Sequence, residues 1–114
     1  MSMVTLEVRS LADTLSDVAQ AMETGKTSAP RLAFETPELL FKTLTGKRWE
    51  LLRTMAGVGP MTIREAARRV GRDVKAVHGD VHALLDAGIL DKTAEGRIVF
   101  PFDAVHVDFM LKVA

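Results

Sequence analysis

The sequence predicts an α+β fold, and three observations carry this prediction. The chain has 114 residues, and apolar and polar side chains alternate near both of its ends, which is typical of half-buried strands. Between the ends, apolar residues recur every three or four positions, which is the period of an amphipathic helix. The third observation is a pair of short strand-like segments on either side of Gly96, which predicts a hairpin.

The N-terminal part predicts one strand followed by one helix. Residues 3–9 alternate in polarity, and Ser10 and Asp13 then have the spacing of a helix start. The helix is expected to run from 11 to 22 and to end near Gly25. Its apolar face consists of Leu11, Leu15, Val18, Ala19 and Met22.

The middle of the chain predicts a short extended segment and two helices. Residues 31–35 form the extended segment, after a turn. Thr36 and Pro37 suit the cap and the first position of a helix that ends near Leu44. Thr45 caps a further helix. The packing face expected for it contains Trp49, Leu52, Met55 and Ala56.

Two more helices are predicted, joined by a tight turn. Thr62 and Glu65 have the spacing of a capping box, and Gly71 suits the left-handed end of that helix. Asp73 then caps the next helix, which Gly88 ends. The buried stripes expected for the two helices are Ile63, Ala66, Ala67 and Val70, and Val74, Val77, Val81, Leu84 and Leu85.

The order of these elements is that of a winged helix-turn-helix. A helix, a tight turn, a second helix and a glycine stop are followed by a hairpin whose tip is 94–96. We assign the DNA-binding domain to residues 36–103. Residues 1–35 form an N-terminal strand-helix extension and residues 104–114 a C-terminal strand, and both are expected to serve dimerisation.

Composition excludes several classes of protein. The chain has no cysteine, which rules out disulfides and thiolate metal sites. No apolar run approaches the roughly 18 residues of a membrane span, and the start of the chain lacks the pattern of a signal peptide. We therefore expect a cytoplasmic protein with no membrane contact.

The net charge is zero, but the charges are segregated along the chain. Residues 1–41, 42–75 and 76–114 carry net charges of −3, +6 and −3. The basic block covers the elements that flank phosphates when a helix-turn-helix docks on DNA, although a solvated charged face is the alternative. Its cations are Lys42, Lys47, Arg48, Arg53, Arg64, Arg68, Arg69, Arg72 and Lys75.

The second helix of the motif is the expected recognition helix. The side opposite its buried stripe holds Lys75, Ala76, Gly79, Ala83 and Asp86, with His78 and His82 on the flank, and only the first two turns are expected to reach the bases. Lys75 suits a guanine or a phosphate, and each histidine can donate a hydrogen bond. Gly79 is unfavourable inside a helix, so it either lets the backbone approach DNA or packs closely against another helix.

Further DNA contacts are expected from the first helix and from the hairpin. Arg64, Arg68 and Arg72 are assigned to phosphates. Lys92 and Arg97 flank the hairpin tip, where they reach a minor groove or are simply surface charges. The recognition face has no Asn, Gln or Arg in its first two turns, so DNA shape, Arg72 and the hairpin are expected to supply much of the specificity.

No enzyme is predicted. His78 and His82 have the spacing of two zinc ligands, with His106 as a conceivable third, but the glutamate base of a zinc peptidase is missing. The glycine-rich segment 57–60 lacks the lysine and threonine of a phosphate-binding loop. No serine lies in a glycine-flanked elbow. We therefore expect no metal, no cofactor and no catalytic residue.

The segments FETPELLFKTLTGKRWELLRTM and TIREAARRVGRDVKAVHGDVHALLDAGIL resemble the small prokaryotic transcriptional regulators of the MarR-like winged-helix group. The resemblance runs from about Phe34 to the C-terminus. It implies a homodimer that places its recognition helix in the major groove and its hairpin beside the minor groove. Some relatives resemble antitoxins encoded beside a toxin. The ends of this chain depart from the long terminal helices of many MarR-type regulators, which leaves the mode of dimerisation open.

Two functions follow as hypotheses. The first is a transcriptional regulator that binds double-stranded DNA as a homodimer. The alternative is a protein-interaction module, such as the antitoxin of a toxin partner, with or without DNA binding. The strands at 3–9 and 104–113 are expected to pair with each other, either within one subunit or across a two-fold axis. We favour the arrangement across the axis, with the helix at 11–22 packed on the apolar face of the resulting sheet.

Overall fold

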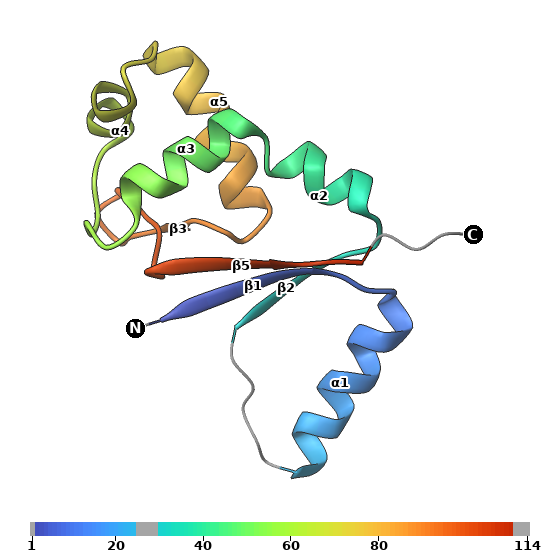
Figure 1. Cartoon of the computed structure of the whole chain (residues 1–114). Helices are drawn as coiled ribbons and strands as arrows, with labels where there is room; N and C mark the ends of the chain where they lie inside the picture. The colour runs from blue at the N-terminus through green and yellow to red at the C-terminus, as the bar shows by residue number, and fades with distance from the viewer. Residues whose placement is uncertain (1, 25–29, 111–114) are drawn as a thin grey trace.

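The computed structural model describes residues 2–24 and 30–110. Over these residues the chain has the predicted α+β class (Figure 1). The N-terminal half contains β1 (Met3–Val8), α1 (Leu11–Thr24), β2 (Arg31–Phe34), α2 (Pro37–Thr43) and α3 (Gly46–Met55). The C-terminal half contains α4 (Ile63–Val70), α5 (Val74–Asp86), β3 (Asp91–Lys92), β4 (Ile98–Val99) and β5 (Ala104–Asp108).

Both chain ends contribute to one parallel sheet with the strand order β2-β1-β5. In the register of this sheet, Leu6 of β1 lies between Leu32 of β2 and Val107 of β5. The predicted pairing of the terminal strands is confirmed, but the expectation that they pair across a two-fold axis is wrong. Both edges of β1 are already occupied by strands of the same chain, so β1 has no edge left for a partner.

The terminal strand is also shorter than the alternation in the sequence suggested. It ends at Asp108, whereas alternation continues to residue 113. Residues 111–113 of that prediction lie outside the described residues, as does Gly25, the expected end of α1.

The core lies on one face of the sheet, beneath α2, α3 and α5 (Figure 1). Val4 and Leu6 point into it from β1. Val4 and Leu6 belong to a single cluster of buried apolar side chains. Its other members include Leu40 of α2, Leu51, Leu52 and Met55 of α3, Val77, Val81 and Leu84 of α5, and Ile98 and Phe100 after the hairpin tip. The terminal strands therefore share their core with the central helices.

α1 lies on the other side of the sheet and projects away from it (Figure 1). Its expected packing on the apolar face of the sheet is wrong within one chain, because α2, α3 and α5 already cover that face. Leu15 is 59% exposed and Met22 is 80% exposed. None of the described helices is both long enough and apolar enough to span a bilayer.

The helix caps agree with the sequence prediction. The side chains of Thr36 and Thr45 accept hydrogen bonds from the amides of Leu39 and Arg48, at 3.2 and 3.3 Å. In α3 and α5, two residues expected in the core are more exposed than predicted, namely Trp49 at 38% and Val74 at 42%. In α3, Leu51 rather than Trp49 is fully buried.

Candidate nucleic-acid interface

α4 and α5 are joined by a turn of three residues, as the sequence predicts. Thr62 accepts a hydrogen bond from the amide of Glu65 at 3.1 Å, and Gly71 ends α4 with a φ of 69°. Asp73 then caps α5 by accepting from the amide of Lys75 at 3.1 Å. The reciprocal half of the predicted capping box is not formed, because the carboxylate of Glu65 pairs with arginines of its own helix.

α5 buries one side and exposes the other. Val77, Val81 and Leu84 have no more than traces of accessible surface. The N-terminal end of this helix lies beside α4, at the end of the molecule farthest from the sheet (Figure 1). All five residues of α5 that were expected to contact DNA are exposed: Lys75, Ala76, His78, Gly79 and His82. Ala83, expected on the same side of the helix, is half-buried.

Gly79 lies in the middle of this exposed face. A Cβ atom placed on it meets no other atom within 4 Å. The alternative that Gly79 permits close packing against another helix is therefore wrong within a single chain. Its helical backbone is open to any molecule that approaches α5.

His78 and His82 contact each other through their ring nitrogens. The two Nε2 atoms are 2.9 Å apart, and the ring centroids are 4.1 Å apart. One ring donates this hydrogen bond and the other accepts it. His106, the conceivable third metal ligand, lies on β5, and no group of three or more potential ligands is found within 2–24 and 30–110.

Asp80 joins three elements through two arginines. One carboxylate oxygen accepts a hydrogen bond from Nε of Arg48 in α3 at 3.0 Å. The other oxygen forms an ion pair with Arg72, in the α4–α5 turn, at 2.8 Å and without hydrogen-bond alignment. Arg48 also donates to the backbone carbonyls of Lys42 and Thr43, at 3.2 and 3.0 Å, near the end of α2.

These contacts change the interpretation of Arg72. Its side chain is only 22% exposed and is already paired, so it acts as an internal cation and is less available to a phosphate than predicted. Sequence reasoning missed Asp80 as its partner. The available signal was that Asp80 lies one helical turn from both Val77 and Leu84, at the edge of the buried stripe, where a carboxylate requires a compensating charge.

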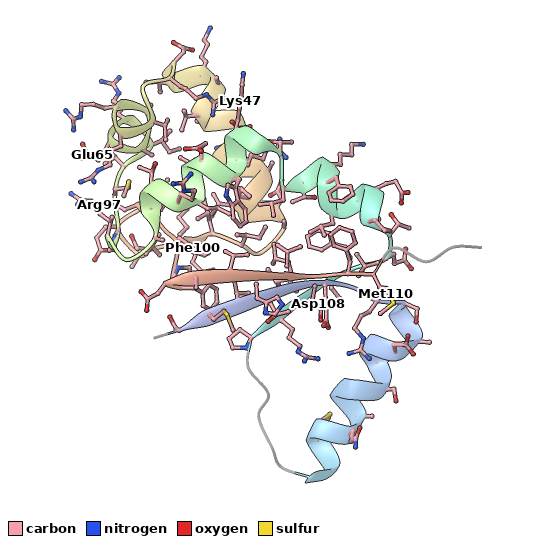
Figure 2. The ribbon with its side chains drawn as sticks, in the orientation of Figure 1. Lys47, Glu65, Arg97, Phe100, Asp108 and Met110 are labelled. Carbon is pink, nitrogen blue, oxygen red and sulfur yellow. The ribbon has the colours of Figure 1, made fainter. Side chains whose placement is uncertain are left out.

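The remaining cations of the basic block differ in their partners. Arg68 and Arg69 pair with Glu65, and Arg53 pairs with Glu50 at 3.2 Å, all on helix surfaces. No ion pair with another described residue is found for Lys42, Lys47, Arg64 or Lys75. The Lys47 side chain points away from the sheet (Figure 2).

β3 and β4 form the predicted antiparallel hairpin, with Lys92 opposite Ile98. Two hydrogen bonds between Thr93 and Arg97 close the tip. The Thr93 amide donates to the Arg97 carbonyl at 2.8 Å, and the Thr93 hydroxyl oxygen accepts from the Arg97 amide at 3.1 Å. Met61, just before α4, exchanges two backbone hydrogen bonds with Ile98. Lys92 and Arg97 are both exposed, and Arg97 lies on the same side of the molecule as Glu65 of α4 (Figure 2).

Residues 43–107, more than half of the chain, match the family model of HVO_A0114. The chain belongs to the HVO_A0114 family. The part that matches this family runs from the end of α2 to β5 and contains the helix pair, the hairpin and all ten expected DNA-contacting residues. No curated protein and no solved structure gives a significant match.

Within this family region, a cavity of about 160 Å³ lies between α3 and β5. Trp49, Phe100 and Val105 contribute apolar walls, and Arg53 and Asp103 contribute charges. The cavity is separate from the exposed face of α5, and its lining contains neither a histidine nor a hydroxyl side chain.

Proposed function

We propose that this chain is a transcriptional regulator that binds double-stranded DNA as a homodimer. In this proposal α3, α4, α5 and the β3–β4 hairpin form a winged helix-turn-helix of the MarR-like type, and α5 is the recognition helix. The observation that carries the proposal is the exposed face of α5. It combines a lysine, two hydrogen-bonding rings and an uncovered backbone at Gly79, and it is presented by a short helix-turn-helix.

The proposed docking follows from the positions of the exposed groups. α5 enters the major groove with its N-terminal turns, where Lys75 reaches a base or a phosphate. Lys47 and Arg64, which have no carboxylate partner among the described residues, contact phosphates beside it. Lys92 and Arg97 approach the minor groove from the hairpin.

The test of this function is a titration against genomic DNA fragments at two salt concentrations. Arg64→Ala is expected to weaken binding to all sequences alike and to flatten the slope of log affinity against log salt by about one unit. Lys75→Ala is expected to cost about 1–3 kcal/mol at the preferred fragment and less on random DNA, if Lys75 contacts a base.

Arg53→Ala is the matched control, because Arg53 is an exposed helical arginine that lines the cavity beside β5 and lies outside the proposed face. Its salt slope should equal that of the unmodified protein. Failure of the protein to prefer any fragment over random DNA would contradict the proposal.

An exposed apolar patch supports the homodimer. The rings of Phe41 in α2 and Phe109 after β5 meet edge to face, with centroids 5.2 Å apart, and are 55% and 41% exposed. Both residues lie outside α4, α5 and the hairpin. We propose that a second copy of the chain covers this patch, because two recognition helices give a weak set of base contacts a usable affinity.

The double variant Phe41→Ser, Phe109→Ser is expected to halve the mass measured by light scattering and to weaken DNA binding. Val58→Ser removes an equally exposed apolar side chain from the α3–α4 loop and should leave the mass unchanged. If the double variant remains a folded dimer, the second copy does not cover this patch. The patch would then favour the other candidate function, a protein-interaction module of the antitoxin type.

A further inference from the structure

His78 and His82 are separated by one turn of α5 and turn their Nε2 atoms toward each other. The 2.9 Å separation of these atoms corresponds to an N–H···N hydrogen bond between the rings. Both rings are on the solvent-exposed face of the helix. Gly79 lies on the same face, between the two histidines in the sequence, and has open space around it.

The same separation suits chelation of one metal ion. Two nitrogen–metal bonds of about 2.0–2.1 Å at a right angle place the nitrogens roughly 2.9 Å apart, and a tetrahedral angle places them roughly 3.3 Å apart. The rings therefore need only a small movement to bind one ion. The Nε2 proton of the donating ring moves through solvent to the Nδ1 atom of the same ring, which leaves both Nε2 lone pairs for the ion. α5 already fixes the two side chains one turn apart, so little further ordering is required.

We propose that His78 and His82 form a bidentate site for a divalent transition metal ion such as Zn²⁺, Ni²⁺ or Cu²⁺. Imidazole nitrogens prefer these ions to Mg²⁺ or Ca²⁺, which take oxygen ligands. No third protein ligand joins the pair within the described ranges 2–24 and 30–110, so water occupies the remaining coordination positions. This differs from the sequence expectation of no metal, which rested on the weakness of spacing as evidence by itself and on the absence of a catalytic glutamate.

The site does not depend on DNA binding. If α5 does read DNA, however, a bound ion would engage the Nε2 atoms that otherwise donate to bases and would add positive charge to that face. Metal binding and DNA binding are therefore measured separately, so that failure of one is not confused with failure of the other.

The experiment is a calorimetric titration of the untagged protein with Cu²⁺, Ni²⁺, Zn²⁺ and Mn²⁺ at neutral pH and without DNA. The expected result is one ion per chain, with Cu²⁺ bound tightest, Mn²⁺ weakest, and Ni²⁺ and Zn²⁺ between them. In an NMR spectrum, Cu²⁺ should broaden the ring protons of His78 and His82 before those of His106.

His82→Gln should lower the affinity for Ni²⁺ at least tenfold while the protein stays folded, since residue 82 is exposed and the change is on the helix surface. His106→Gln, on β5, is the control and should bind Ni²⁺ as the unmodified protein does. Equal Ni²⁺ affinity of the His82→Gln variant and the unmodified protein would overturn the proposal. So would the absence of Cu²⁺ binding at millimolar concentration.

Discussion

Replacement of Asp80 by alanine is expected to lower the free energy of unfolding by about 2–4 kcal/mol. Asp80 is the shared partner of Arg48 and Arg72, and all three side chains are no more than 22% exposed. The variant leaves two poorly hydrated guanidinium groups without a counter-charge, which costs more than the net value of the ion pairs themselves. It also loosens the contact of α5 with α3 and with the α4–α5 turn.

Urea denaturation followed by circular dichroism measures this effect. The control is Glu50→Ala, which removes the carboxylate of another arginine pair, Glu50–Arg53, in which both side chains are more than 60% exposed. That variant should change stability by less than about 0.5 kcal/mol. If the Asp80 and Glu50 variants lose the same stability, the proposed role of Asp80 as an internal link is wrong.

The sequence predicted the local structure of this chain well. The caps at Thr36, Thr45, Thr62 and Asp73 all form, because a cap depends on one side chain and an amide two or three residues away. The left-handed ends at Gly71 and Gly88 follow from the same local chemistry.

Long-range features were harder to predict. Alternation identified the strands at both ends but could not show that β1 is the central strand, with β2 and β5 on its two sides. This topology decides which face of the sheet is covered, so the placement of α1 was predicted wrongly as well.

The candidate site was predicted in part for the same reason. The helical period placed Lys75, Ala76, His78, Gly79 and His82 on one exposed face, as the structure has them. It could not reveal which cations are already paired. The Arg72 side chain is 22% exposed and forms an ion pair at 2.8 Å with Asp80, eight residues further along the chain. Counting charges along the sequence cannot predict such a contact.

Substitutions of Gly79 are expected to change stability and DNA binding in opposite directions. Gly79→Ala should raise the free energy of unfolding by up to about 1 kcal/mol, because alanine favours the helix and its Cβ meets nothing within 4 Å. Gly79→Leu should also fold well, since leucine is a good helix former and the added side chain points into open space.

The Gly79→Leu variant is expected to bind the preferred DNA fragment at least a hundredfold more weakly, a loss of about 2.7 kcal/mol. The reason is that the branched side chain would separate the backbone of α5 from the base edges. Ala12→Leu adds the same kind of bulk to the exposed side of α1 and should leave DNA affinity unchanged. Thermal unfolding and a fluorescence-anisotropy titration of the same samples measure both quantities. The contrary result is a folded Gly79→Leu protein that binds the fragment as tightly as the unmodified chain. It would show that this face of α5 does not contact DNA, because a leucine side chain has no room between the helix backbone and the bases.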